Sequence, residues 1–258
     1  MNQNERREYL IKYLLKEEIR FGRQSIPADK QGQENLLRSL MNVRPPRPIS
    51  HEFLEIQDEY LTERNIERGI TDVATLTPVK SDSRLYIWQG DITTLKCDAI
   101  VNACNSQMLG CFSPMHACID NFIHTYAGVE LRLKMHEIMT KQGYEEETGK
   151  AKVTSGYNLQ AKYVLHTVGP IIQWKVTQED ENLLASCYKE CLKLAADTGV
   201  ESIAFCCLST GVFRFPQQRA AEIATETVMQ FLKKDDRIKK VIFNVFKNED
   251  LEIYSHLL

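Results

Sequence analysis

The strongest constraint on the fold is an alternation that begins at Leu85. Short apolar runs rich in branched residues alternate there with longer segments of helical periodicity. The apolar runs are LYIW from 85, AIVNA from 99, KYVLHTV from 162, SIAFCCL from 202 and KKVIFNVF from 239. Helical patterns lie between them at about 115–139, 181–198 and 217–233. This order predicts an α/β domain with a largely parallel sheet and helices on both of its faces.

Before this alternation, the chain has only helical patterns. Apolar residues recur at helical spacing over 4–21 and again in ENLLRSLMNV over 34–43, which the prolines at 45–48 end. Ser50 is a candidate N-cap for a third helix. We therefore expect residues 1–80 to form a helical extension and residues 81–258 to form the main domain. Each helix has a single apolar stripe, so packing onto the main domain is favoured over a separate interaction module.

Charge and hydropathy exclude several classes of protein. The net charge of −3 provides no basic field for a nucleic-acid backbone. No apolar run reaches the roughly 18–20 residues that cross a bilayer. The N-terminus MNQNERREYL lacks the apolar segment of a secretory signal, which predicts a cytoplasmic protein without membrane attachment. The first strand is not followed by G-x-G-x-x-G, which disfavours an oxidoreductase.

The polar, glycine-bearing loops all follow predicted strands. They are Gly90–Thr93, Asn102–Cys118, Gly169–Pro170 and Ser209–Pro216. The carboxyl ends of parallel strands meet at one edge of a sheet, and ligands bind beyond that edge. The four loops therefore predict a single site.

Cys111, His116 and Cys118 lie in the second of these loops with the spacing C-x4-H-x-C. Thiolate and imidazole are good ligands for zinc, and three protein ligands leave a fourth position for water or substrate, as in catalytic zinc sites. A closed structural site and three unrelated residues are the alternatives, and we favour the open site. The other six of the eight cysteines lie in apolar or helical surroundings, which indicates buried thiols.

Five motifs together resemble the macrodomain family over nearly all of the chain from about Leu85. They are GDIT (90–93), VNACN (101–105), TGKAKVTSGYNL (148–159), YVLHTVGP (163–170) and LSTGVFRFP (208–216). The resemblance implies a three-layer α/β/α macrodomain with a mixed, largely parallel central sheet. It also implies that the pocket binds ADP-ribose.

The resemblance assigns roles to individual residues. Asp91 looks like the acceptor for the exocyclic amine of adenine, with Ile92 beside it, although Asp91 could instead cap the turn that follows. Asn105 looks like the asparagine that touches the distal ribose, whereas we expect Asn102 to fix its turn. The backbone N–H groups of one loop are expected to hold the diphosphate; its residues are Ser209, Thr210, Gly211, Val212 and Phe213.

Two aromatic residues carry weaker expectations. His166 lies in a strand whose neighbours are apolar, which favours a core histidine with satisfied hydrogen bonds over a catalytic one. Phe246 follows the last predicted strand, and it could stack on adenine or pack in the core.

The segment LGCFSPMHACID (109–120) departs from the glycine-rich loop and acidic residue of other catalytic macrodomains. It resembles the zinc-containing macrodomain hydrolases of bacteria, fungi and protists, which also carry a helical N-terminal extension. The resemblance implies zinc as cofactor and Asn105, Cys111, His116 and Cys118 as catalytic residues. It leaves open whether the ion activates water or orients a ribose hydroxyl.

The implied reaction removes mono-ADP-ribose from a protein side chain, which we expect to be acidic, and releases ADP-ribose. A lipoyl-carrier protein modified by a sirtuin-type transferase is a candidate target that the resemblance suggests. The alternatives are a non-catalytic reader of ADP-ribose and an O-acetyl-ADP-ribose deacetylase.

Overall fold

A central six-stranded sheet organises the computed structural model, which describes residues 1–17 and 25–258. The strands follow the order β2-β8-β7-β4-β6-β5 across the sheet. All neighbouring pairs are parallel except β5 and β6, which are antiparallel. The strand bounds are β2 Leu85–Gln89, β4 Ala99–Cys104, β5 Ala151–Ser155, β6 Tyr163–Val168, β7 Ser202–Phe205 and β8 Lys240–Val245. The prediction of a mixed, largely parallel sheet is therefore confirmed.

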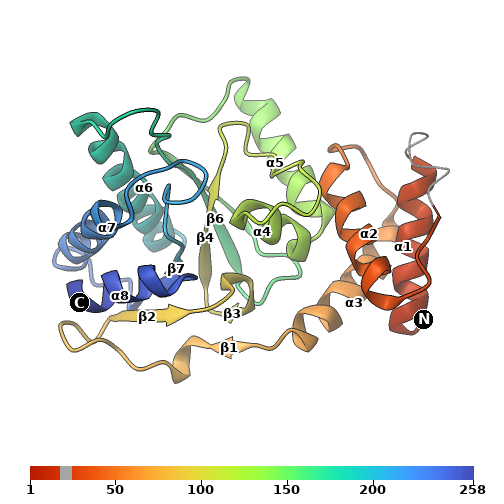
Figure 1. Cartoon of the computed structure of the whole chain (residues 1–258), viewed down its shortest axis with the longest axis horizontal. Coiled ribbons are helices and arrows are strands. Elements are labelled where there is room, and N and C mark those ends of the chain that lie inside the picture. Colours follow the sequence, from red (N-terminus) through yellow and green to blue (C-terminus); the bar gives the residue numbers. More distant parts are fainter. Residues whose placement is uncertain (18–24) are drawn as a thin grey trace.

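Helices cover both faces of this sheet (Figure 1). Helices α4 and α5 lie on one side, α6 and α7 lie on the other, and α8 packs against β2 and β8. The bounds are α4 Ile119–Ala127, α5 Val129–Gln142, α6 Gln178–Asp197, α7 Gln217–Leu232 and α8 Asn248–Leu257. Strands β4, β6, β7 and β8 are buried between these layers, and this explains their nearly continuous apolar sequences.

Three more helices form the N-terminal extension, which lies beside α4 and α5 at one end of the molecule (Figure 1). They are α1 Gln3–Glu17, α2 Lys30–Val43 and α3 His51–Glu67. Ser50 caps α3 as predicted, because its side chain accepts a hydrogen bond from the Phe53 backbone N–H. The end of the first predicted helix, at 18–21, lies outside the described residues.

The extension has an apolar core of its own and polar contacts with the main domain. The core contains Leu10, Leu36 and Phe53, and among the described residues Val129 is the one buried member that comes from the main domain. At the junction, the buried Gln57 side chain accepts a hydrogen bond from Val129 N at 2.9 Å, and Asn65 Nδ2 donates to Asn158 O at 2.7 Å. The division of the chain at residue 80 remains a prediction.

Short elements lie in the connection between the two parts and directly after β2. Strand β1 (Thr71–Asp72) pairs in parallel with β3 (Leu95–Lys96). Two 3-10 turns, η2 (Val73–Thr75) and η3 (Ile92–Thr94), each follow a capping aspartate. In the described part of the chain, no helix has the length and apolar character that crossing a bilayer requires.

One predicted element is wrong in extent. The helix expected from Met115 to Met139 begins only after Cys118 and is split into α4 and α5. Met115 has a left-handed backbone with a φ of 57°, and Gly128 has a φ of 101°, so neither residue can continue a right-handed helix. Helix α8, which follows β8 almost directly, was not predicted from the sequence.

Candidate active site

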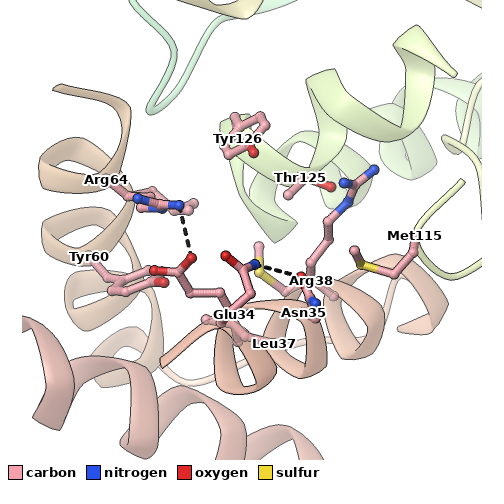
Figure 2. Close-up of a pocket in the computed structure, with 12 residues that line it drawn as sticks. Glu34, Asn35, Leu37, Arg38, Tyr60, Arg64, Met115, Thr125 and Tyr126 are labelled. Atoms are coloured by element: carbon pink, nitrogen blue, oxygen red, sulfur yellow. Dashed lines mark hydrogen bonds and ion pairs between the residues drawn. The ribbon is translucent and has the colours of Figure 1, made fainter. Parts of the chain in front are cut away.

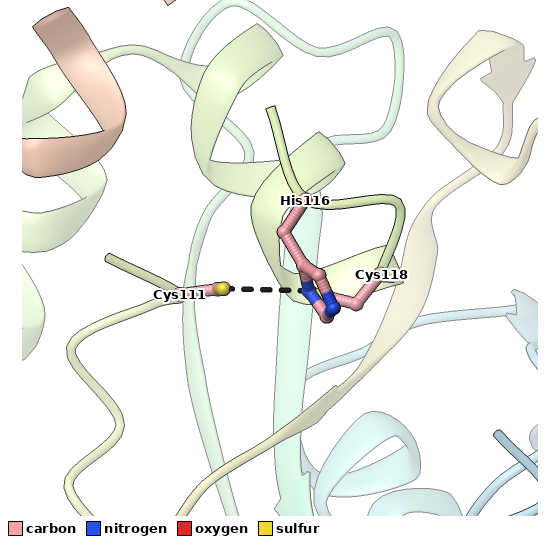
Figure 3. Close-up of side chains that lie close together, drawn as sticks. All are labelled: Cys111, His116 and Cys118. Carbon is pink, nitrogen blue, oxygen red and sulfur yellow. Dashed lines mark hydrogen bonds between the residues drawn. The ribbon is translucent and has the colours of Figure 1, made fainter. Parts of the chain in front are cut away.

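Cys111, His116 and Cys118 lie together in the segment between β4 and α4 (Figure 3). One ligand atom from each side chain lies within 4.8 Å of the other two, and Cys111 Sγ is 3.6 Å from His116 Nδ1. A tetrahedral zinc ion, at about 2.3 Å from sulfur and about 2.0 Å from nitrogen, would separate its ligand atoms by roughly 3.5–4 Å. The three side chains therefore fit a zinc ion in both chemistry and spacing.

Cys118 is the residue that precedes helix α4, so its thiol is close to the positive end of that helix. Burial nevertheless raises the pKa of this half-buried thiol to about 12, and Cys111 beside it adds to the rise. A thiol with this pKa is neutral at pH 7, whereas a metal ligand must be a thiolate. Metal binding at this site would therefore release a proton.

Asn105 lies where the 105–118 loop begins, after β4. Its side-chain oxygen accepts from Met108 N at 3.1 Å, and its Nδ2 donates to Gly110 O at 3.3 Å. Gly110 approaches His124 so closely that a Cβ at position 110 would be 2.8 Å from the imidazole ring. Asn105 thus shapes the loop in this structure, and its contact with a distal ribose stays a prediction.

A buried polar network lies under the loop. Asn102 Nδ2 is 2.8 Å from Asp120 Oδ1 and 3.2 Å from His166 Nδ1, and His166 Nε2 is 3.0 Å from Thr154 Oγ1. Burial lowers the pKa of His166 to about 3 and raises that of Asp120 to about 6. The core role predicted for His166 is confirmed. The turn role predicted for Asn102 is wrong, because Asn102 is a fully buried residue inside β4.

Asp91 follows β2 and has two sets of partners. Its Oδ1 accepts a hydrogen bond from the Thr93 backbone N–H at 2.9 Å and so caps η3. This is the capping role that the sequence allowed as an alternative to binding adenine. Its Oδ2 accepts from the guanidinium of Arg68, whose Cζ is 3.3 Å from the centre of the Tyr126 ring. The Asp91 side chain is still 29% exposed, which leaves room for a further donor. Ile92 is buried, so only its backbone could reach a ligand.

The loop after β7 carries the residues predicted to hold a diphosphate. Ser209 is buried and has a left-handed φ of 64°, whereas Gly211 and Val212 are exposed. Thr210 Oγ1 donates to Cys207 O at 3.0 Å, which closes the turn. Helix α7 begins at Gln217, shortly after this loop. The loop therefore presents exposed backbone near the positive end of a helix, an arrangement that suits an anion.

A second loop, after β6, is locked against this one. A Cβ on Gly169 would be 2.1 Å from Ser209 Oγ, so only glycine allows this approach. Ile172 N donates to Phe213 O at 2.8 Å, which joins the two loops a second time. Phe246, at the end of β8, is 76% exposed, so packing in the core is not its role.

A cavity of about 150 Å³ lies between α2, α3 and α4 (Figure 2). Arg38, Arg64, Tyr126 and Met115 are among its lining residues, whereas residues 209–213 are not. The cavity is therefore separate from the predicted diphosphate loop. Through Met115, the residue before His116, it adjoins the 105–118 loop, named the metal loop for its candidate ligands Cys111, His116 and Cys118.

The loop that begins at Gly169 was among the four predicted to meet at one site, and the structure joins it to the loop after β7. Arg68 was not predicted from the sequence. It had no sequence signal, since it lies at the end of a surface helix and pairs with a residue 23 positions away.

Comparisons with known proteins agree with this architecture. Residues 101–224 match the family model for the Macro domain. The chain is 56% identical, over 100% of both chains, to a protein of Treponema medium named protein-ADP-ribose hydrolase. It is 50% identical to a protein of the same name from Staphylococcus aureus, over 97% of this chain and 94% of that one. A Trypanosoma brucei macrodomain solved in complex with ADP-ribose superposes with a TM-score of 0.65 at 28% identity, covering 85% of this chain and 94% of the other. The chain therefore belongs to the macrodomain family.

Proposed function

We propose that this protein is a zinc-dependent hydrolase that removes mono-ADP-ribose from acidic side chains of modified proteins. Two relatives that match nearly the whole chain are named protein-ADP-ribose hydrolase, which supports the reaction class. The observation that carries the zinc dependence is the cluster of Cys111, His116 and Cys118, whose ligand atoms lie within 4.8 Å of one another. A lipoyl-carrier protein as the modified target stays a prediction from the resemblance.

Each part of the site has a role in this proposal. The carboxylate of Asp91 accepts a hydrogen bond from the exocyclic amine of adenine. The backbone N–H groups of residues 209–213 bind the diphosphate. These contacts lie away from the reacting bond, and their binding energy holds that bond in place. Asn105 and the metal ligands face the distal ribose. Cys111, His116 and Cys118 would hold a zinc ion, which would supply Lewis-acid chemistry beside the distal ribose.

The overall reaction adds one water molecule across the bond between the anomeric carbon of the distal ribose and the carboxylate oxygen of the target. The carbon gains the hydroxyl group of the water. The side chain leaves as a carboxyl group that carries the remaining proton. The products are free ADP-ribose and the unmodified protein.

Removal of the metal is the direct test of zinc dependence. We expect the purified protein to contain about one zinc per chain and to release ADP-ribose from a mono-ADP-ribosylated protein. Treatment with a chelator should abolish the release, and added zinc should restore it. Elemental analysis and chromatography of released ADP-ribose provide the two readouts. Full turnover by protein that elemental analysis shows to be free of metal would contradict the proposal.

The same assay separates the alternative functions. A reader of ADP-ribose would bind the modified protein without releasing ADP-ribose, whether or not zinc is present. An O-acetyl-ADP-ribose deacetylase would use the same pocket, so rates measured side by side on the two substrates would rank them.

Arg68→Ala should weaken ADP-ribose binding by about three- to tenfold. The substitution removes the cation that orients the Asp91 carboxylate, and the loss of one charge-assisted hydrogen bond at this partly buried site costs on the order of 1 kcal/mol. Isothermal titration of ADP-ribose measures the change. Arg84→Ala is the matched control, because Arg84 pairs with Asp82 in the same way but away from the site. Equal affinities of the Arg68 variant and the parent protein would rule out this role.

A further inference from the structure

Helix α2 of the extension contacts the loop that carries Cys111 and His116. Arg38 Nη2 donates to the backbone oxygen of His116 at 3.0 Å. One turn further along α2, Asn42 Oδ1 accepts from Met115 N at 3.1 Å. Two side chains of α2 therefore hold the backbone of residues 115 and 116, across about 75 residues of sequence. Both side chains lie outside the 101–224 segment that matches the family model.

Arg38 also reaches the first part of the loop through Asn121. Its Nη2 donates to Asn121 Oδ1 at 2.8 Å, and Asn121 Nδ2 donates to Ser113 O at 3.0 Å and to Cys111 O at 3.5 Å. Asn121 is fully buried, so its orientation is fixed by these partners. The guanidinium of Arg38 stacks 4.3 Å from the centre of the Phe122 ring, which fixes its own position. A continuous chain of hydrogen bonds thus joins α2 to the backbone at both 111 and 116.

The loop requires such support because it has little regular structure of its own. It contains no helix or strand between Asn105 and Cys118, and the His116 side chain is exposed. Met115 has a left-handed backbone, which costs a residue other than glycine free energy and persists only when its surroundings hold it. The hydrogen bond from Met115 N to the buried Asn42 meets that requirement.

We propose that Arg38 and Asn42 are positioning residues of the metal loop, so that the extension completes the metal site. They touch no ligand atom and act through the backbone that carries Cys111 and His116. This inference rests on the metal site of the proposed function, but it does not depend on the identity of the substrate. Residues that orient metal ligands without touching the metal commonly contribute to metal affinity, and their removal weakens metal binding by about 10- to 100-fold.

The cavity in Figure 2 makes Arg38 a practical position for a test. Arg38 lines this cavity together with Arg64, so an alanine at position 38 enlarges a polar space that water can enter and leaves the apolar core of the extension intact. Arg64 is the matched control, because it lines the same cavity but forms ion pairs with Glu34 and Glu67 instead. Among the described contacts, it makes none with the metal loop.

The experiment compares the zinc affinity of the full-length parent protein with those of Arg38→Ala and Arg64→Ala, by competition with a chromophoric chelator. We expect Arg38→Ala to raise the zinc dissociation constant by about 10- to 100-fold and Arg64→Ala to leave it unchanged. Arg38→Lys should recover part of the affinity, because a lysine can reach one of the two acceptors. In the cobalt-loaded protein, Arg38→Ala should also alter the thiolate-to-cobalt absorption bands, which report the ligand geometry.

The outcomes separate this inference from the proposed function. A folded Arg38→Ala variant with the zinc affinity and cobalt spectrum of the parent would overturn the inference alone. A parent protein that binds no zinc would overturn the proposed metal site and this inference with it. If Arg38→Ala does not fold, Arg38→Met decides in the same way, because it keeps a long unbranched side chain but has no donor. Parent affinity in Arg38→Met would then refute the positioning role.

Discussion

Cys111→Ala and His116→Ala should each abolish zinc binding and lower the rate of ADP-ribose release by at least about 100-fold. The expected loss is large because removing a ligand disrupts the site more than removing a supporting residue, and supporting residues alone commonly cost 10- to 100-fold. Affinity for ADP-ribose should change little, since the predicted adenine and diphosphate contacts come from Asp91 and residues 209–213. Elemental analysis, a release assay and calorimetry with ADP-ribose measure the three quantities.

Two control variants make the same substitutions, cysteine to alanine and histidine to alanine, at positions away from the candidate metal ligands. Cys97→Ala removes a buried thiol, and His136→Ala removes an exposed imidazole on α5. Both should retain zinc and activity. Turnover at the parent rate in metal-free Cys111→Ala would refute the catalytic role of the metal. A loss of ADP-ribose affinity as large as the loss of rate would show that the loop serves binding instead.

Asp91→Ala should weaken ADP-ribose binding by about 10- to 100-fold. A hydrogen bond to a charged group contributes about 1.5–3 kcal/mol, and each 1.4 kcal/mol corresponds to a factor of ten. Asp91→Asn should fall between the alanine variant and the parent, because its amide oxygen still caps η3 and still accepts from adenine. Calorimetry with ADP-ribose and with ribose 5-phosphate tests whether the lost contact belongs to the adenine end.

Asp72 is a close match for Asp91 elsewhere in the chain. Each aspartate caps a 3-10 turn by accepting from the backbone N–H two residues later, and each pairs with a cation, Lys96 or Arg68. Asp72→Ala therefore reproduces the loss of a cap and an ion pair away from the site. If both alanine variants weakened binding equally, the effect of Asp91 would be one of stability, and its predicted contact with adenine would be wrong.

The sheet could be predicted from the sequence because its signal is local. Each apolar run ends in a polar loop, and parallel strands bring those loops to one edge, so the convergence of residues 91, 105 and 209 follows without coordinates. The prediction of one continuous helix over 115–139 was wrong because of the backbone conformation at two positions. The apolar spacing continues through Met115 and Gly128, but their backbone conformations interrupt the helix.

The cluster of candidate metal ligands could be predicted because one short segment carries all three residues. The arginines that hold the site in place could not be predicted. Arg38 contacts residue 116 across 78 positions, and Arg68 contacts residue 91 across 23. An arginine on an amphipathic surface helix has the same sequence signature whether it faces solvent or a loop. Asn102 was misplaced for a related reason, because an asparagine is rare in a buried strand and its partners, Asp120 and His166, lie far along the chain.

The contact between Gly169 and Ser209 restricts how the pocket can move. The loops after β6 and β7 meet there without a gap, and the bond from Ile172 to Phe213 ties them again. Outward movement of one loop alone would break the hydrogen bond from Ile172 N to Phe213 O, so a ligand that widens this side must break that bond or displace both loops together. Hydrogen exchange of the Ile172 amide would report how often this bond opens.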